Sequence, residues 1–514
     1  MRQLSSFMRV GAHILRAWQQ AKAEQQYREN VNRLKNNDVS GRLPNAKLGD
    51  GDDLIAGGFT AKMSGPYVGV WDGQPRFNNT DLPMSILAGT GGGKTGSMAS
   101  SIIAGLGQGD APESVVTVSF KPDLAWTTYQ GRSALDGIPS AQFMPFSQCW
   151  DEQVTFNFFD DLIDLASRGH RIVDRARAKN SIVFGPVRKA NKLNSWVVEI
   201  AEELSFCLLA HRCELEPRLA NAASMAGVAN YTRAQLIVEL DEMRGSPACE
   251  GLVADLAQKF VDDFSATDDS AAKEYRWVMQ EYAKAWRPFQ KGSPLRDATM
   301  QSSFDLASLK QHPRNLNIYF PPRYAISHAS FIQLMLEHII DTLAHAPGDV
   351  RVSLILDEFG QLPRLNNALL ALRVYREMGV RLILLAQDLN SFDAYKDDGG
   401  HKPFLSNTIN LIWAQRDAET LRNLESRGGQ RAHLIASANA EHAREGDRGG
   451  LSIAEHLTSV LPGDAIQRIN QNRLILDAPG TPLTILDRPM FWDLPFAAPY
   501  VLNFNDHPIP PLDD

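Results

Sequence analysis

Short runs of apolar residues recur along most of the chain, and several are separated by stretches with the three-to-four-residue periodicity of helices. The runs predict core strands at residues 67–71, 84–87, 115–120, 316–320, 352–356, 381–386 and 408–414, and a hairpin that joins 473–476 to 483–486. Helices are predicted over 97–104, 331–343 and 368–377. The alternation of the two patterns predicts an α/β fold.

A long middle stretch, from about residue 162 to 305, has helical patterns and few strand runs. Its clearest apolar stripes are formed by Trp196, Val197, Ile200, Leu204 and Leu208, and by Leu252, Leu256 and Phe260. Thr232 is a candidate N-cap for a further helix. We therefore predict an all-α domain at 162–305, inserted into an α/β domain whose two parts are 44–161 and 306–495.

The two ends of the chain differ from this body. In residues 1–43, apolar side chains recur at helical spacing beside eight basic residues, Arg2, Arg9, Arg16, Lys22, Arg28, Arg33, Lys35 and Arg42. Such a basic amphipathic helix can lie on an anionic membrane surface, dock on a partner, or pack on its own domain. Residues 496–514 form a Pro-rich tail, which we predict to be extended.

The strand at 84–87 leads into a glycine-rich loop that ends in Lys94 and Thr95 and is followed by a helix. This is the context of a P-loop, in which backbone N–H groups and the helix N-terminus face phosphates. The predicted nucleotide-binding residues are Gly89, Thr90, Gly91, Gly92, Gly93, Lys94 and Thr95. Lys94 would reach the β- and γ-phosphates of ATP, and Thr95 would bind Mg²⁺. The alternative is a glycine-rich turn that matches by chance.

Two further strands end in polar side chains that suit the same site. The strand at 352–356 runs into Asp357 and Glu358, a Walker B pattern, in which Asp357 would hold Mg²⁺ and Glu358 would act as general base. The strand at 381–386 ends in Gln387, where P-loop ATPases with additional strands place a γ-phosphate sensor. The alternatives are an acidic strand end on the surface and a glutamine that caps a strand.

Composition and charge narrow these expectations only a little. The 514 residues suggest two to four domains, and a net charge of −8 argues against a protein that coats DNA. The four cysteines form no C-x-x-C pair, which predicts reduced thiols. No run of eighteen apolar residues and no secretory signal is present, so we predict no transmembrane helix. A basic stretch in the all-α domain would touch nucleic acid or an acidic substrate tail, or be a solvated helix face: Arg171, Arg175, Arg177, Lys179, Arg188, Lys189 and Lys192.

Several segments together resemble the type IV coupling proteins, the ATPases that feed relaxase–DNA complexes or effector proteins into type IV secretion channels. The likeness runs from about residue 60 to 495 and is carried by the P-loop and by the segments 356–365, 379–390, 404–408, 304–309 and 489–492. The resemblance implies a RecA-like P-loop NTPase domain with an inserted all-α domain that helps to recognise substrates. Two features depart from the family: the usual pair of membrane-spanning helices is missing, and Ser119-Phe120-Lys121-Pro122-Asp123 replaces an Asp-x-Lys-Gly-Glu pattern.

The resemblance also implies surroundings for the protein. It implies a hexameric ring in the bacterial cytoplasm, at the cytoplasmic face of the inner membrane, with inner-membrane components of the secretion system, DNA and the substrate proteins as partners. Residues 1–43 would then attach the chain to the membrane surface or to a membrane partner.

In a ring, a neighbouring subunit supplies a cation to each site. Arg416 is our candidate for this arginine finger, with Arg364 and Arg381 as rivals, and the alternative for Arg416 is a surface ion pair with Asp417 or Glu419. Two other functions compete with a coupling protein. One is a different ring translocase, such as a chromosome pump or a helicase, and the other is a scaffold that recruits substrates without hydrolysing ATP.

Overall fold

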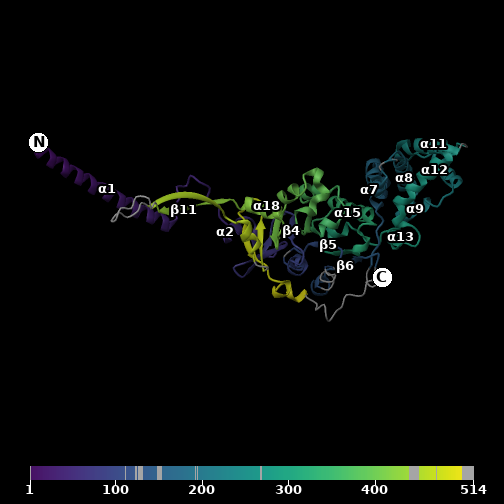
Figure 1. Ribbon diagram of the computed structural model, residues 1–514. Helices are drawn as coiled ribbons and strands as arrows, with labels where there is room; N and C mark the ends of the chain where they lie inside the picture. The colour runs from purple at the N-terminus through teal and green to yellow at the C-terminus, as the bar shows by residue number, and fades with distance from the viewer. Residues whose placement is uncertain are drawn as a thin grey trace.

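The computed structural model describes residues 2–109, 111–121, 124, 131–146, 153–191, 193, 195–266, 269–438, 451–469 and 472–500. The molecule is elongated, with a long N-terminal helix at one end, a group of helices at the other end, and a mixed α/β body between them (Figure 1). Several residues named in the sequence analysis lie outside the described residues. They are Pro122 and Asp123 of the segment that departs from the family, Lys192 of the basic stretch, Cys149, one of the four cysteines, and residues 501–514 of the Pro-rich tail.

Within the described residues, one 12-stranded sheet organises the body, in the order β1-β3-β2-β14-β13-β10-β4-β9-β8-β5-β7-β6. From β10 to β6 in this order the strands run parallel, and from β10 to β1 they run antiparallel. The strands are β1 Phe59–Thr60, β2 Tyr67–Trp71, β3 Gln74–Asn78, β4 Met84–Ala88, β5 Ser114–Ser119, β6 Ser140–Phe143, β7 Asn315–Tyr319, β8 Val352–Leu356, β9 Val380–Ala386, β10 Ile409–Trp413, β13 Arg473–Asp477 and β14 Thr484–Asp487.

Helices cover both faces of this sheet, because neighbouring residues of the central strands belong to two different cores. Val115 and Ile355 pack in the core that contains α3, whereas Val116 and Leu354 pack in the core that contains α15. This is why most of the central strands are largely apolar rather than strictly alternating. The helices of the body are α2 Gly51–Ala56, α3 Ser100–Gly107, α5 Ala134–Asp136, α14 Ser308–Gln311, α15 Ala329–His345, α16 Ala368–Leu370, α17 Lys402–Ser406, α18 Ala418–Gly428 and α19 Gly463–Gln467.

Two predicted helices contain wider turns. The helix after the glycine loop begins with the π-helical segment η1, Thr95–Ala99, before α3. The helix predicted at 368–377 is α16 followed by a second π-helical segment, η8, Ala371–Tyr375. Short 3₁₀ segments complete the body: η6 Pro322–Tyr324, η7 Phe359–Gln361, η9 Leu389–Asp398, η10 Phe491–Asp493 and η11 Ala498–Tyr500.

Between β6 and β7, the described residues form helices and no named strand. The helical unit, as we call it, consists of α6 Asp160–Ser167, α7 Val173–Ala190, α8 Ser195–Leu215, α9 Ala222–Val228, α10 Arg233–Met243, η4 Ala248–Gly251, α11 Leu252–Ser265, α12 Asp269–Trp286, η5 Arg287–Phe289 and α13 Pro294–Ala298. Thr232 caps α10 through a capping box with Gln235, as predicted. Val197, Leu204 and Leu208 are buried, but Trp196 at the start of their stripe is exposed.

The opposite end of the molecule is an arm formed by α1, Arg2–Asn36, and the antiparallel pair β11, Gln430–Ala438, and β12, Leu451–Ser459. The sequence predicted a helix here but not the two strands. The second half of α1 contacts the strands, since Asn30 Nδ2 donates to the Leu451 carbonyl at 2.9 Å. The first half points away from the body (Figure 1). None of the described helices combines the length and the apolar composition that a membrane span requires.

Candidate nucleotide-binding site

The glycine loop leaves the carboxyl end of β4 and turns through backbone conformations that favour glycine. Gly91 and Gly93 have φ values of 75° and 72°. A side chain on Gly89 would place its Cβ 2.5 Å from the Ala414 carbonyl oxygen. The loop is further held by Trp413, whose indole N–H donates to the Gly92 carbonyl at 2.7 Å. The predicted P-loop therefore has the tight curvature that its motif requires.

Lys94 and Thr95 lie where the loop enters the helix. The Lys94 ammonium donates to the carbonyl oxygen of Ala88, the last residue of β4, at 3.1 Å, and its side chain folds back along the loop. Thr95 opens η1. A lysine in this position can exchange a backbone oxygen for a phosphate oxygen by rotation of its own side chain.

Asp357 follows β8 at the same edge of the sheet and is 2% exposed. Its Oδ2 accepts a hydrogen bond from the Ser119 hydroxyl at 3.0 Å. Its Oδ1 has no hydrogen-bond partner among the described residues. Burial and the charge of Glu358 raise the pKa of Asp357, while Lys121 and Lys94 oppose that shift. A buried carboxylate oxygen without a partner suits a hydrated divalent cation, which takes oxygen ligands.

Glu358 and Gln387 are brought together, and Thr90 of the glycine loop joins them. Gln387 Nε2 donates to Glu358 Oε2 at 3.0 Å, and the Thr90 hydroxyl donates to Gln387 Oε1 at 3.2 Å. Glu358 has a left-handed backbone, with φ at 51°, which turns the chain sharply after β8. Lys121 Nζ lies 3.7 Å from Glu358 Oε1. The ends of β4, β8 and β9 thus share one polar chain of side chains.

Arg488 is a buried contributor that the sequence motifs did not predict. Its Nη1 donates to the Ser97 hydroxyl at 2.5 Å, and its guanidinium lies 4.7 Å from the centre of the Trp413 ring. It therefore packs between the first turn of the glycine-loop helix and the end of β10. The available signal was its position directly before the segment Pro489-Met490-Phe491-Trp492, which packs on the same helix at Gly96.

The three arginine-finger candidates have different surroundings. Arg416 is exposed after β10. Among the described residues it has no hydrogen bond or ion pair, so it forms no ion pair with Asp417 or Glu419. Asp417 instead caps α18 by accepting from the Thr420 N–H at 2.8 Å. Arg364 pairs with Asp398 at 2.6 Å.

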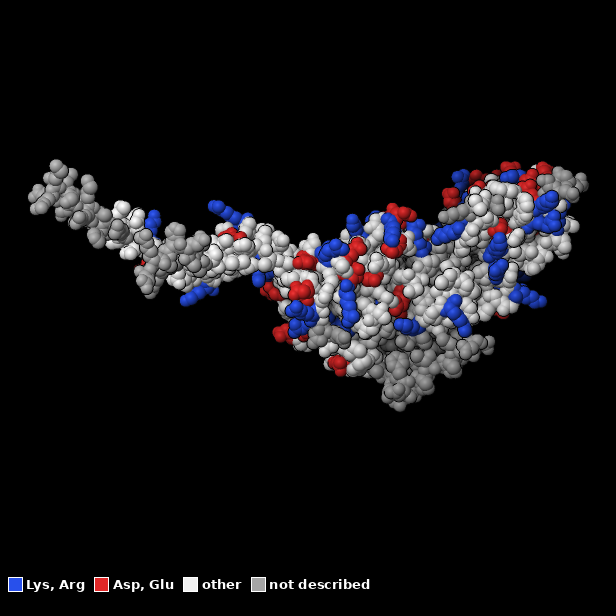
Figure 2. Space-filling model, viewed as in Figure 1, with Lys and Arg blue, Asp and Glu red and all other residues white. Residues whose placement is uncertain are grey.

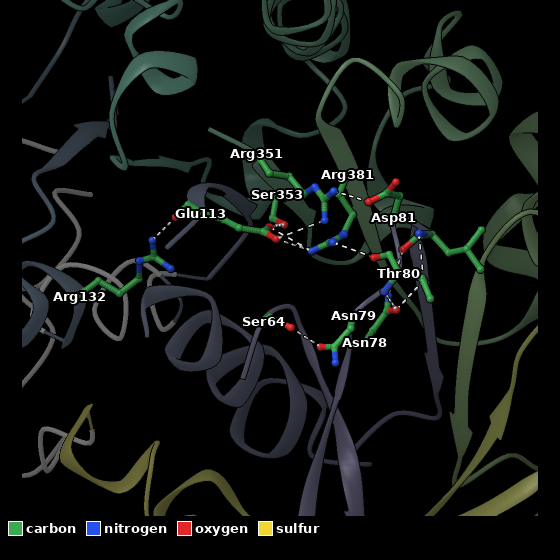
Figure 3. A network of polar contacts seen from close by, with 11 residues as sticks. Ser64, Asn78, Asn79, Thr80, Asp81, Glu113, Arg132, Arg351, Ser353 and Arg381 are labelled. Carbon is green, nitrogen blue, oxygen red and sulfur yellow. Dashed lines mark hydrogen bonds and ion pairs between the residues drawn. The ribbon is translucent and has the colours of Figure 1, made fainter. Parts of the chain in front are cut away.

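Arg381 is unsuitable as a finger because it is 1% exposed. Its Nη1 lies 2.8 Å from Glu113 Oε1, and its Nη2 donates to the Thr80 carbonyl at 3.0 Å (Figure 3). Ser353 donates to the same glutamate at 2.6 Å. This network joins the starts of β5, β8 and β9, at the edge of the sheet opposite the glycine loop, so Arg381 cannot reach a neighbouring site.

Most cations of the basic stretch contact other side chains of the same chain, while Arg171, Arg177 and Arg188 remain exposed, as on a solvated helix face. Arg171 pairs with Glu250 at 2.9 Å, and Arg175 pairs with Asp341 at 3.3 Å. Further contacts join Lys179 to Asp161, Arg188 to Glu202, and Arg177 to the face of Phe206. On the face of the molecule shown in Figure 2, basic and acidic side chains interleave. These cations therefore do not form a row of unpaired charges.

Comparison with known proteins gives a consistent result. The family model for type IV secretory system conjugative DNA transfer matches residues 19–495. The solved structures that match include the bacterial conjugative coupling protein TrwBdeltaN70 in an unbound form, with 14% identity, a TM-score of 0.56, and coverage of 87% of this chain and 93% of that chain.

Two TrwB complexes match similarly, each covering 87% of this chain and 94% of the other. The complex with the ATP analogue ADPNP has 14% identity and a TM-score of 0.55. The complex with ADP and Mg²⁺ has 15% identity and a TM-score of 0.54. No curated protein sequence matches. Because these sequence identities are low, the matches to solved structures show the fold alone. They confirm the predicted fold class, a RecA-like P-loop NTPase. Since the family model spans most of its residues, the chain belongs to the type IV secretory system conjugative DNA transfer family.

Proposed function

We propose that the protein is an ATP-hydrolysing coupling protein, which recruits a relaxase–DNA complex or effector proteins and delivers them to a type IV secretion channel. The observation that carries this proposal is the polar chain from Thr90 through Gln387 to Glu358, beside the unpaired oxygen of buried Asp357. This arrangement joins a phosphate-binding loop to a carboxylate that can activate water. A scaffold that does not hydrolyse ATP has no need of a carboxylate that can activate water.

ATP and Mg²⁺ are the ligands that the site would take, as the TrwB complexes with ADPNP and with ADP and Mg²⁺ suggest. The N–H groups of residues 89–95 and Lys94 would bind the phosphates, while Thr95 and Asp357 would hold the cation. Mg²⁺ supplies positive charge that offsets the charge developing on the phosphate oxygens. Ser119 keeps the Asp357 carboxylate oriented by its hydrogen bond to Oδ2.

Glu358 would accept a proton from the attacking water. Gln387 fixes the position of that carboxylate in the structure, and its Oε1 is held by Thr90. The second N–H of Gln387 Nε2 can donate to a γ-phosphate oxygen while Thr90 of the phosphate-binding loop holds Oε1, so Gln387 can respond to the presence of a γ-phosphate. This would make the geometry of the base depend on the bound nucleotide.

The test compares purified full-length native protein with Lys94→Ala and Glu358→Gln. Lys94→Ala should lose both nucleotide binding and phosphate release, because the phosphate clamp is removed. Glu358→Gln should bind nucleotide normally and release phosphate about 10²–10⁴-fold more slowly, which is the usual contribution of a general base. Glu377→Gln, an exposed carboxylate outside the site, is the matched control.

Two measurements keep the proposal open to refutation. Native protein that binds ATP without turnover, with or without DNA, would favour the scaffold. Isolation of the complexes formed in conjugating cells would decide the cargo: a relaxase with its DNA, or effector proteins, supports a coupling protein. Recovery of chromosomal DNA without either partner would favour a different ring translocase.

A further inference from the structure

Helix α15 carries two adjacent buried polar side chains that contact different parts of the molecule. Glu337 and His338 are both 6% exposed. Successive residues on a helix point about 100° apart, so they can engage separate partners. Glu337 reaches the loop that follows Glu358, and His338 reaches α7 of the helical unit. The helix therefore lies between the candidate site and the helical unit.

Glu337 holds the far end of the 358–367 loop, which is the segment from Glu358 to Asn367. Its Oε1 accepts hydrogen bonds from the N–H groups of Asn366 and Asn367, the latter at 3.3 Å. The neighbouring Leu365 N–H donates to the Tyr395 hydroxyl at 2.9 Å. Backbone donors that packing shields from solvent need such acceptors. Glu337 thus supplies the last anchor of the loop.

The near end of the 358–367 loop is fixed by aromatic packing. Phe359 stacks on Tyr395, with ring centres 5.8 Å apart and planes 8° apart. Tyr395 therefore contacts both ends, through its ring at Phe359 and through its hydroxyl at Leu365. Because Tyr395 contacts both ends of the loop, a shift at Leu365 can be passed through this ring to Phe359, the residue after Glu358.

His338 takes part in a buried contact with the helical unit. The Lys179 ammonium, on α7, has three donors, and it directs them to the Phe158 carbonyl at 2.5 Å, to Asp161 Oδ1 at 2.6 Å and to His338 Nδ1 at 3.1 Å. Burial and the charge of Lys179 lower the pKa of His338 to about 3. The ring is therefore neutral and accepts at Nδ1, which leaves its proton on Nε2.

We propose that Glu337 is a positioning residue for Glu358, and that the contact of His338 with Lys179 and Asp161 ties its placement to the helical unit. This inference rests on the proposed function, because it assigns Glu358 a role in turnover. A displacement of about 1 Å at a reacting group is enough to lower a rate about a hundredfold. A displacement of the helical unit that moves α15 would then change turnover without any contact with the nucleotide.

The first test separates positioning from binding. Glu337→Ala removes the acceptor of two backbone donors, whereas Glu337→Gln keeps a carbonyl oxygen in the place of Oε1. In the full-length protein, we expect Glu337→Ala to lower kcat at least tenfold with KM for ATP within about twofold of native, and Glu337→Gln to recover most of the rate. Equal losses in both variants, or a loss confined to KM, would overturn the positioning role.

The second test follows the loop directly and does not depend on ATP turnover. Amide hydrogen exchange at Asn366 and Asn367 should speed up at least tenfold in Glu337→Ala. The double variant Lys179→Met/Asp161→Asn removes the buried polar contact of His338 with the helical unit, keeps the Arg175–Asp341 pair between α7 and α15, and leaves no unpaired buried charge. We expect faster exchange at the same two amides in this variant, although neither substitution touches the loop.

The control is Lys259→Ala, which breaks an exposed ion pair with Glu203 in the same helical unit. It should leave the exchange of Asn366 and Asn367 unchanged. Native-like exchange in Lys179→Met/Asp161→Asn would overturn the link to the helical unit. If native protein fails to hydrolyse ATP while the exchange results hold, the proposed function fails and the physical link through α15 stands.

Discussion

At the scale of single residues, buried charges at the two edges of the sheet have different partners. At the start of the parallel strands, Glu113 and Arg381 form a direct pair that carries no unbalanced charge. At the carboxyl ends, Asp357 has the neutral hydroxyl of Ser119 as its hydrogen-bond partner. The first arrangement is complete by itself, whereas the second leaves negative charge for a cation to balance.

Glu337 gives a prediction about stability and pH. Its pKa is raised to about 6, from an ordinary value of 4.5, chiefly by burial. The folded protein therefore binds this proton more tightly than the unfolded chain does. The stabilisation from the protonated group is fully present below pH 4.5 and is lost as the pH rises through 6, by about 2 kcal/mol in total.

Glu337→Gln cannot ionise, so it should be more stable than the native protein at pH 8 by up to about 2 kcal/mol, and equally stable near pH 4. Urea unfolding of both proteins at the two pH values measures the difference. If the free energies of unfolding of the two proteins differ by the same amount at pH 4 and pH 8, the carboxyl group does not titrate as its burial predicts.

At the scale of elements, the arm is the part with the least support from the rest of the fold. A two-stranded antiparallel pair is marginal on its own in water. Here it is joined by α1 and by the segment after it, where the Ala432 N–H donates to the Pro44 carbonyl at 3.0 Å. In the first half of α1, Leu15 and Trp18 are 60% and 62% exposed. That half is basic, with no acidic residue before Glu24.

We expect the first half of α1 to bind an anionic membrane surface. Deletion of residues 2–22 removes four basic side chains and leaves the contacts of Asn30 and Pro44 with the strands intact. Cosedimentation with vesicles rich in anionic phospholipid should weaken about tenfold or more, while ATP binding is unchanged. Neutral phosphatidylcholine vesicles are the control. If the full-length protein does not cosediment with anionic vesicles, direct attachment to lipid is ruled out.

The elements also show which features a sequence can predict. The strand expected at 115–120 is β5, Ser114–Ser119, because both of its faces are buried and its β-branched run from Val115 to Val118 is unbroken. β11 and β12 escaped prediction because few of their side chains are buried, Ala432 and Leu434 among them, and because the strands mix His and Glu with Ile and Leu. The glycine loop, Asp357 and Gln387 were predictable from local motifs. Ser119 and Arg488 were not, since their contacts depend on which distant strands become neighbours.

At the scale of the whole molecule, we propose that Arg416 acts between the subunits of a ring. It is exposed after β10, the strand beside β4, and no described side chain pairs with it. We expect Arg416→Ala and Lys94→Ala to be inactive separately. In mixed rings, an intact glycine loop can meet an intact arginine from its neighbour, so part of the ATPase activity should return.

Arginine fingers contribute about 10³-fold or more to the rate where they have been measured, so the restored activity should be readily detected. Arg422→Ala, on the exposed surface of α18, is the control and should remain active alone. Normal turnover by Arg416→Ala at high protein concentration would mean that another residue supplies the charge, or that the protein does not work as a ring.

The strand order has a consequence for how the chain can mature. β4, which leads into the glycine loop, has β9 and β10 as its two neighbours, and both come from the far half of the chain. During synthesis both edges of β4 therefore stay unpaired until β9 and β10 have left the ribosome. Open strand edges invite pairing with other chains, and late long-range pairing slows folding. A nascent chain of this protein thus has a long interval in which its central strand can pair with other chains, and chains truncated before β9 cannot complete the centre of the sheet.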